Sequence, residues 1–427
     1  MRPVYMISGG ITKFAKAHIN KDFRLMVKEA YDYALRDVPR FSKDMIDGAV
    51  GSYFSDHFTR QLKAASMVQD YLGLCPKPSK RVEGGGATGG LCFQSAWEAI
   101  ASGRMNCCLA FGFETMSRVN TWKGNEFIAL ASDTNFDFPV GGFYSGYYAM
   151  MVQRHMYEFG TTVEQLAMVS VKNHVNALCN PYAQKAKRLS VKQVRESPMV
   201  ATPLTMEDIC TMSDGAATCI LASEELAAKV CDRPVRIAGV GSGSDTMRMA
   251  DRPHDKVMLL PHEQESDYLH LRYPGVHSFR GGRMAGKLAY EMAGIRNPLE
   301  ELSFVELHDA YTSSEIQTYE DLGLCKYGEG GRFVESGAPF MADVNYGLDI
   351  PKAGRLPVNP SGGLLACGHP VGATGLMQAV FAFWQLQGTT SKHLGDDTLQ
   401  VQQAKRGLIH SHAGTGTYIT VSILEAT

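Results

Sequence analysis

Short apolar runs alternate with longer amphipathic stretches along most of the chain. The apolar runs, typical of buried strands, cover residues 3–10, 107–114, 216–223, 234–243, 302–311 and 407–424. The amphipathic stretches predict helices over residues 23–38, 60–72, 92–102, 162–178, 282–293, 313–322 and 375–386. Strands that alternate with helices in this way favour an α/β fold with mixed sheets.

The second half of the chain repeats the order of elements in the first. A glycine-rich turn at residues 84–90 leads into a helix and then a buried strand, and "NPSGGLLACGHPVGATG" leads into another helix and a later strand. Two similar halves that face each other would bring both turns to one central site. We therefore predict an N-terminal half at residues 1–265 and a C-terminal half at residues 266–427.

Three stretches depart from this alternation. Residues 115–200 are aromatic, rich in methionine and polar, which predicts an inserted cap or loop domain. Residues 244–280 and 326–356 are expected to be long irregular insertions. Long loops in compact enzymes often shape a binding site.

Composition narrows the class of protein. The chain has 427 residues, 44% of them apolar and 20% charged, with a net charge of −2 and no run rich in Lys or Arg, which argues against nucleic-acid binding. We expect no membrane span, because no apolar stretch reaches the roughly 18–20 residues required. The ten cysteines lie mostly in apolar company without a CxxC pair. They therefore predict reduced thiols in a cytoplasmic protein without a structural zinc site.

Histidines stand in the three segments that could carry chemistry. His308 lies in "ELHDAYTSSEIQTYEDLGLC", His369 lies in the second glycine-rich turn, and His410 and His412 lie in "HSHAGTGTY". Each could be an ordinary structural histidine in an ordinary turn. We expect no metal at His410 and His412, because no carboxylate lies near them in the sequence.

Together these motifs resemble the thiolase superfamily, and most closely the branch that contains the thiolase domain of sterol carrier protein X. The ordered set "GGGATGG … HDAYTSSEIQTYEDLGLC … NPSGGLLACGHPVGATG … HAGTG" carries the resemblance, which spans nearly the whole chain. It implies a thiolase fold: two duplicated α/β halves in five αβαβα layers, with an inserted loop domain. It also implies a homodimer or tetramer that uses coenzyme A as substrate or product and needs no cofactor.

The resemblance assigns roles to individual residues. The nucleophilic cysteine of thiolases falls at Gly86, so this chain lacks it. His369 matches the histidine that deprotonates that cysteine, and His308 matches the one that binds the thioester oxygen. His412 falls where many thiolases carry a second, acid/base cysteine. The N–H groups of Gly86 and Gly414 match an oxyanion hole. We expect the missing side chain at Gly86 to leave space for about one thiol.

One function consistent with these residues is Claisen or retro-Claisen acyl transfer of the 3-oxoacyl-CoA thiolysis type. A glycine cannot be acylated, so the thiol would have to be Cys367, Cys92 or that of CoA itself. Cys367 is the better candidate of the two cysteines because it stands two residues from His369.

Two alternatives remain open. A retro-aldol lyase acting on a β-hydroxyacyl-CoA needs a base and enolate stabilisation but no nucleophile, which suits Gly86. In thiolase-fold aldolases, however, tyrosines stand at the positions of His308 and His369. Tyr311 could donate a proton in such a reaction or pack in the core. The other alternative is a non-catalytic thiolase-fold subunit of a complex.

The resemblance also predicts a partner, a small separate protein with a zinc ribbon and an OB fold that helps to admit the acyl-CoA. The aromatic residues 143–148 and the insertion 244–280 could line a pocket for a bulky acyl group, or could serve loop packing and oligomer contacts. His57 is a further candidate for the site.

Overall fold

The computed structural model describes residues 1–269, 271, 275–351 and 353–427. The strands are β1 (Val4–Ile11), β2 (Gly48–Ser52), β3 (Ser79–Val82), β4 (Cys107–Thr115), β5 (Met199–Ala201), β6 (Leu204–Thr205), β7 (Asp214–Ser223), β8 (Val235–Ser244), β9 (Phe304–Glu306), β10 (Arg406–Ala413) and β11 (Tyr418–Ala426). The α-helices of the first half are α1 (Phe23–Arg36), α2 (Asp56–Thr59), α3 (Ala64–Tyr71), α4 (Thr88–Ala101), α5 (Thr121–Ala129), α6 (Tyr144–Phe159), α7 (Val163–Asn176), α8 (Val191–Arg195) and α9 (Glu224–Val230). Those of the second half are α10 (Arg280–Ala293), α11 (Pro298–Glu301), α12 (Thr312–Asp321), α13 (Gly330–Glu335), α14 (Gly363–Cys367), α15 (Val371–Gln387) and α16 (Thr390–Leu394).

Two halves of one sheet form the frame of the molecule. Within the described residues, nine strands are ordered β3-β2-β4-β7-β1-β8-β11-β10-β9, and β5 and β6 form a separate pair. The halves meet where β1 pairs with β8, through Tyr5 with Arg236 and Met6 with Val235. This pairing covers only one end of β1, so the two halves diverge from it and leave room for helices between them.

The strand order confirms the duplication. Numbered along the chain, the strands of the first half lie in the order 3-2-4-5-1. If β8, β9, β10 and β11 of the second half are numbered 1, 2, 4 and 5, they follow the same order. Val358, which bridges to Val305 in β9, then stands where strand 3 belongs. This second repeat starts with β8, and the domain boundary near residue 265 stays a prediction.

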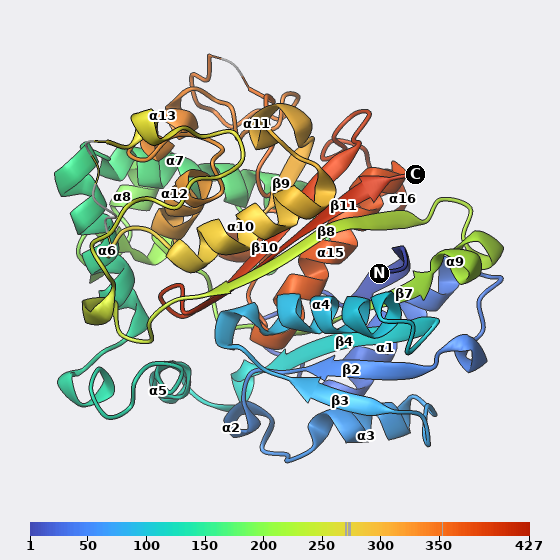
Figure 1. Cartoon of the computed structure of the whole chain (residues 1–427). Helices are drawn as coiled ribbons and strands as arrows, with labels where there is room; N and C mark the ends of the chain where they lie inside the picture. Colours follow the sequence, from blue (N-terminus) through green and yellow to red (C-terminus); the bar gives the residue numbers. More distant parts are fainter. Residues whose placement is uncertain (270, 272–274, 352) are drawn as a thin grey trace.

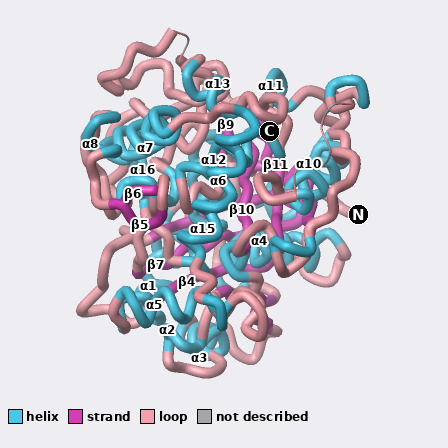
Figure 2. The backbone as a smooth tube through the Cα atoms, turned by 90° about the vertical axis from the view of Figure 1, so that its left-hand side faces the viewer, coloured by secondary structure: helices cyan, strands magenta, loops and turns pink. Residues whose placement is uncertain are grey.

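The helices complete five layers. Helices α4 and α15 lie side by side between the two sheet halves and contact both of them (Figure 1). Helices α1 and α3 cover the outer face of the first half, and α10 covers the outer face of the second half beside α12. The view from the side places α1, α2 and α3 at one end of the molecule and α13 at the other (Figure 2). The predicted αβαβα thiolase fold is therefore confirmed.

Glycines bring the two central helices into main-chain contact. A Cβ atom on Gly89 of α4 would lie 2.6 Å from the nitrogen of Gly375 in α15, and one on Gly375 would overlap the nitrogen of Gly90. Both helices start several residues before the sequence indicated, α4 at Thr88 and α15 at Val371. Glycines normally mark turns, but here they let two helices pack backbone to backbone.

Most predicted elements are present, but strands β2 and β3 and short helices such as α2 and α9 were not predicted. Further differences lie in the insertions. Helices α5 to α8 lie in the segment 115–200 that was predicted as a loop domain, and the pair β5–β6 follows at its end, before β7. The insertion at 326–356 is not wholly irregular, because it contains α13. Part of the insertion at 244–280, namely residues 270 and 272–274, lies outside the described residues. In the described part of the chain, none of the helices is long and apolar enough to cross a membrane.

Candidate active site

A cavity of about 100 Å³ lies where the two glycine-rich turns meet the loop segment. Its walls are formed by Phe54, Gly86, Ile128, Ala131, Tyr144, Tyr148, Cys210, His308, Ala310, Tyr311, His369, Val371, His412 and Gly414. These include His308, His369 and His412, the two glycines predicted to form an oxyanion hole, and Tyr311. Residues from both halves of the chain thus converge on one cavity.

Three imidazoles form the centre of this cavity. The ring of His308, between β9 and α12, lies 4.2 Å from the ring of His412 on β10, measured between centroids. The ring of His369, just before α15, lies 4.9 Å from that of His308 and nearly perpendicular to it. A substrate atom that contacts one of these rings is therefore within reach of the others.

Thr374 fixes the tautomer of His369. The Thr374 hydroxyl donates to the carbonyl oxygen of Pro370 at 3.0 Å, so its oxygen accepts from Nδ1 of His369, 2.8 Å away. A neutral imidazole with its proton on Nδ1 has its lone pair on Nε2. His369 therefore has Nε2 available as a base.

Tyr148 fixes the opposite tautomer of His412. The Tyr148 hydroxyl lies 2.7 Å from the carbonyl oxygen of Gly414 and 2.6 Å from Nε2 of His412. Because a carbonyl oxygen only accepts, the phenol donates to it, and Nε2 of His412 donates to the phenol oxygen. The lone pair of His412 is then on Nδ1, which is buried without a hydrogen-bond partner among the described residues.

Burial keeps all three imidazoles neutral. It lowers the pKa of His369 to about 4 and the pKa values of His308 and His412 well below the usual range. For His308, the neighbouring His412 and His369 add to the effect, since two like charges at this distance repel. Neutral imidazoles can act as bases at pH 7.

Position 86 has no room for a side chain. A Cβ atom on Gly86 would overlap the main-chain carbonyl oxygen of His412 and would lie 3.1 Å from Cε1 of His308. The expectation of free space for about one thiol is therefore wrong, because the strand end at His412 fills it. Gly86 and Gly414 both line the cavity, and their N–H groups have no hydrogen-bond acceptor in the described part of the chain. Their role as an oxyanion hole stays a prediction.

The two cysteines predicted as substitute nucleophiles do not reach the cavity. The Cys92 thiol donates to the carbonyl oxygen of Val50 at 3.2 Å, and the Cys367 sulfur accepts from Nδ2 of Asn180 at 3.6 Å. Burial raises the pKa of Cys92 to about 12 and that of Cys367 further, so neither forms a thiolate at neutral pH. Neither residue lines the cavity wall. Cys367 stands two residues from His369 in the sequence, but it ends the short buried helix α14.

Cys210 is the cysteine that lines the cavity in the described part of the chain, and no motif in the sequence pointed to it. Its main-chain N–H donates to the carbonyl oxygen of Ala310, which brings it beside the loop that follows His308. Burial raises the pKa of its thiol to about 12. The thiol is therefore well placed but protonated at pH 7.

Two further residues were predicted to belong to the site, Tyr311 and His57, and only Tyr311 lines the cavity. Tyr311 lies on the cavity wall, where its ring stacks on Tyr148 at 4.1 Å and its hydroxyl lies 3.2 Å from that of Ser145. His57 does not line the cavity. It stacks on Phe127 at 4.9 Å and lines a neighbouring groove.

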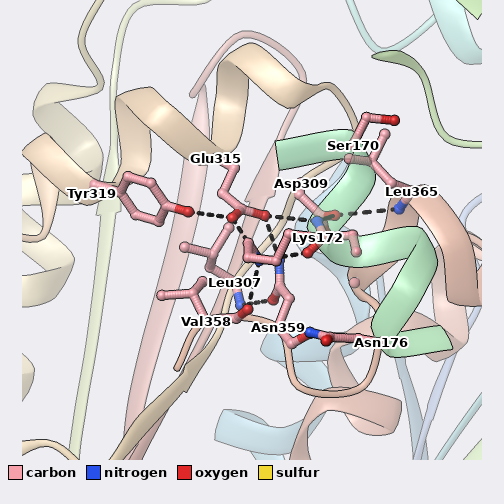
Figure 3. Close-up of polar contacts among 12 residues, drawn as sticks. Ser170, Lys172, Asn176, Leu307, Asp309, Glu315, Tyr319, Val358, Asn359 and Leu365 are labelled. Carbon is pink, nitrogen blue, oxygen red and sulfur yellow. Dashed lines mark hydrogen bonds and ion pairs between the residues drawn. The ribbon is translucent and has the colours of Figure 1, made fainter. Parts of the chain in front are cut away.

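A buried polar network behind the cavity holds the histidine motifs in place (Figure 3). Asp309, next to His308, accepts from the main-chain N–H of Leu364 at 2.6 Å and from that of Leu365 at 3.3 Å, at the start of α14. It also accepts from Nδ2 of Asn173 on α7 at 2.7 Å. The network thus connects the His308 loop to the helix that precedes His369.

The charge in this network is supplied by Lys172 and Glu315. Nζ of Lys172 lies 2.9 Å from Glu315 and donates to the carbonyl oxygen of Val358 at 2.6 Å. Both side chains are 0% exposed. The remaining oxygen of Glu315 accepts from Asn173 and Asn359 at 2.8 and 2.9 Å. This network could not be predicted from the sequence, because its members are far apart in the chain.

A metal site is absent from the described residues, since no group of three or more His, Cys, Asp or Glu side chains there is placed to hold an ion. The ring centroids of His410 and His412 lie 5.5 Å apart. His410 instead accepts a hydrogen bond on Nδ1 from the main-chain N–H of His308 at 3.3 Å. It therefore supports the loop that carries His308.

The chain matches two family models. Residues 4–225 match the thiolase N-terminal domain, and residues 265–426 match the thiolase C-terminal domain-like family. The chain is 38% identical to the acetyl-CoA acetyltransferase of Methanothermobacter thermautotrophicus over 100% of both chains. It is 31% identical to sterol carrier protein 2 of Bos taurus over 99% of this chain and 72% of that protein. Among solved structures, the Ltp2-ChsH2(DUF35) aldolase has a TM-score of 0.76 at 23% identity and covers 99% of this chain and 98% of that one, which shows a common fold. The chain belongs to the thiolase superfamily, in its sterol carrier protein X branch.

Proposed function

We propose that this thiolase-superfamily member makes or breaks the carbon–carbon bond next to a CoA thioester by proton transfer alone, without a covalent acyl-enzyme. The observation that carries the proposal is the steric closure of position 86 by the His412 carbonyl group. The reaction that best fits this site is retro-aldol cleavage of a β-hydroxyacyl-CoA, or the reverse addition, because it requires a base and an oxyanion site but no nucleophile.

The site supplies each proton and charge that this reaction requires. Nε2 of His369 removes the proton of the β-hydroxyl group, and the C–O⁻ electrons form a carbonyl group as the bond between the α- and β-carbons breaks. The released electron pair forms an enolate, whose oxygen is held by His308 and the N–H groups of Gly86 and Gly414. Proton transfer from His369 to the α-carbon gives the shorter acyl-CoA and an aldehyde or ketone, and restores the base.

Acyl transfer, the thiolase reaction itself, is the second candidate, and Cys210 is the observation that favours it. Among the described residues that line the cavity, Cys210 is the one that carries a thiol. Because the pKa of this thiol is raised to about 12, Cys210 would need His369 to remove its proton at the moment of attack. Direct attack by the thiol of CoA would use the same base.

The deciding experiment combines turnover with intact mass. The purified chain would be incubated with β-hydroxyacyl-CoA, β-ketoacyl-CoA plus CoA, and acyl-CoA esters, while products and protein mass are followed. We expect cleavage of the β-hydroxy ester without an adduct, retained in Cys210→Ala and lost in His369→Gln. An acyl adduct on wild type that disappears in Cys210→Ala would instead establish acyl transfer. Activity that survives in His369→Gln would contradict both reactions and the role of this base.

A partner protein and an oligomer belong to the same proposal. The Ltp2-ChsH2(DUF35) aldolase shares the fold, and its name gives two components. We propose that this cytoplasmic chain forms a homodimer or tetramer and binds a small zinc-ribbon/OB-fold protein. Light scattering of the chain alone and after co-expression with such a protein tests both points. A monomer that shows no added mass would contradict them.

A further inference from the structure

Helices α6 and α12 pack against each other and run in the same direction (Figure 2). Their N-terminal ends meet at the catalytic cavity, where the ring of Tyr148 stacks on that of Tyr311 at 4.1 Å. They meet again about 10 Å further along α6, where Nε2 of His155 lies 3.0 Å from both carboxylate oxygens of Glu320. The two helices are therefore joined at both ends.

The contact between His155 and Glu320 is fully buried. The two side chains are 1% and 0% exposed. Because a carboxylate only accepts hydrogen bonds, Nε2 of His155 carries a proton and donates to it. Nδ1 of the same ring lies 2.7 Å from the Thr161 hydroxyl, and Glu320 also accepts from the main-chain N–H of Gly330 at 2.8 Å. Each partner is thus held from two sides.

A second histidine near this pair has a partner of its own. The ring of His277 lies 5.5 Å from that of His155, and its Nε2 donates to Glu158 at 2.6 Å. Glu158 belongs to α6, so His277 ties α6 to the segment that precedes α10. Among the described residues, the hydrogen bonds that join α6 to α12 at this end are those between His155 and Glu320.

We propose that His155 and Glu320 are positioning residues, which hold the hydroxyl of Tyr148 in place by fixing α6 against α12. This inference rests on the proposed function. Tyr148 stands two turns before His155 on the same face of α6. Its hydroxyl contacts Nε2 of His412 at 2.6 Å and the carbonyl oxygen of Gly414 at 2.7 Å, so a shift of α6 changes both contacts.

The position of Tyr148 matters for the proposed reaction. Tyr148 keeps the lone pair of His412 on Nδ1 and holds the turn whose Gly414 N–H is proposed to bind the enolate oxygen. Such donors stabilise the transition state only when they are aligned with the charge that develops there. Neither His155 nor Glu320 lines the cavity, so both act through Tyr148.

The hydrogen bond between His412 and Tyr148 can be observed without turnover. In protein with isotope-labelled histidine, the Nε2–H proton of His412 should give an NMR resonance that is absent from His412→Gln. We expect His155→Asn to shift or broaden this resonance, because the shorter amide keeps the contact with Thr161 but does not reach Glu320. His155→Gln places an amide N–H near the position of Nε2 and should leave the resonance unchanged.

A second variant and a matched control complete the set. Glu320→Asp shortens the acid by one methylene group, which withdraws the carboxylate from His155, and should change the resonance even where His155→Asn does not fold. Tyr290→Phe is the control. Tyr290 is 0% exposed, and its hydroxyl donates from α10 to the carbonyl oxygen of Leu322, directly after α12, at 2.9 Å. Its loss loosens the same end of α12 without touching α6, so the resonance should stay as in wild type.

Steady-state kinetics on the cleaved ester test the consequence for catalysis. We expect kcat to fall by up to about 100-fold in His155→Asn and Glu320→Asp, because a displacement of about 1 Å can have this effect. KM should change little, since neither residue touches the substrate. Both constants should stay near wild type in His155→Gln and Tyr290→Phe.

The outcomes separate this inference from the proposed function. A resonance and a kcat that change in His155→Asn and Glu320→Asp, but not in His155→Gln or Tyr290→Phe, support the proposal. A resonance that is the same in all variants, or that changes equally in Tyr290→Phe, overturns it whatever the turnover, as does an unchanged kcat in His155→Asn. If the resonance changes as expected but wild type cleaves no β-hydroxyacyl-CoA, the positioning of Tyr148 stands and the proposed function falls.

Discussion

At the scale of single residues, the space around Gly86 explains why a glycine stands there. The main-chain carbonyl of His412 and the ring of His308 occupy the volume that a side chain would need. A carbonyl group held in a β-ladder cannot rotate away as a side chain can, so the backbone of β10 would have to move. The missing nucleophile is therefore part of how the histidine cluster is packed.

Gly86→Ala should destabilise the protein for this reason. Overpacking of a tight interior typically costs about 1–3 kcal/mol. Gly146 on α6 is a matched control, because a Cβ atom there meets nothing within 4 Å and alanine favours helix. Urea unfolding should show a lower free energy of unfolding for Gly86→Ala and an equal or higher one for Gly146→Ala. Equal stability of Gly86→Ala and wild type would mean that the position has more room than the structure shows.

Thr374 should matter for catalysis through the tautomer of His369. Thr374→Val keeps the shape of the side chain but removes the acceptor for Nδ1–H, so Nε2 is no longer held as the free base. We expect kcat to fall at least about tenfold, but by no more than the roughly 10²–10⁴-fold that a general base contributes in total. KM should change little. Thr374→Ser keeps the hydroxyl group and should stay near wild type. Steady-state kinetics on the cleaved ester would contradict this role if the valine variant kept full kcat.

At the scale of elements, helix α7 of the loop segment packs against α12, α13 and α14 of the C-terminal half. Helix α7 contributes Lys172 and Asn173, whose partners Asp309 and Glu315 come from the His308 loop and α12. Such a buried ion pair need not add net stability, but it is costly to break. The pair therefore fixes the position of α7 relative to the histidine motifs.

A double-mutant cycle would measure this coupling. Lys172→Met leaves Glu315 buried without its cation and should cost about 3–5 kcal/mol. Lys172→Met with Glu315→Leu removes both charges and should be less destabilising than the single lysine change. Urea unfolding of both singles, the double and wild type gives the coupling energy. Additive single effects would show that the two charges do not interact.

At the scale of the whole molecule, the sequence predicted more of the fold than of the site. The alternation of strands and helices and the duplication could be predicted, because they are local patterns repeated along the chain. The three histidines could be predicted as candidates, because each lies in a distinctive motif. Cys210 could not be predicted, since it stands in no motif. Tyr148 was expected only as part of the aromatic segment 143–148, because its partner His412 lies 264 residues away. The glycine-rich starts of α4 and α15 look like turns in the sequence. Only the contact between the two helices shows why glycine is needed there.

The stability of the molecule should have an optimum in pH, because two kinds of buried group act in opposite directions. The histidine pKa values are lowered, to about 4 for His369 and about 3 for His410, so the unfolded chain binds more protons below pH 6.5 and stability falls as the solution becomes acidic. The carboxyl pKa values are raised, mainly by burial, to about 8 for Glu114 and about 7 for Glu306. Above pH 4.5 the unfolded chain releases these protons first, so stability falls as the solution becomes alkaline.

Glu114→Gln should separate the two effects. One Glu114 oxygen accepts from the main-chain N–H groups of Phe54 and Gly372 at 2.8 and 3.0 Å, and a glutamine oxygen can do the same without ionising. Relative to wild type, the variant should gain up to about 1.4 kcal/mol of stability for each pH unit between pH 4.5 and 8, and nothing more beyond that range. Urea unfolding from pH 5 to 9 measures the difference. Parallel curves for the two proteins would show that Glu114 does not titrate abnormally. A gain confined to that window would show that the protein keeps a neutral carboxyl group behind Phe54, at the edge of its catalytic cavity.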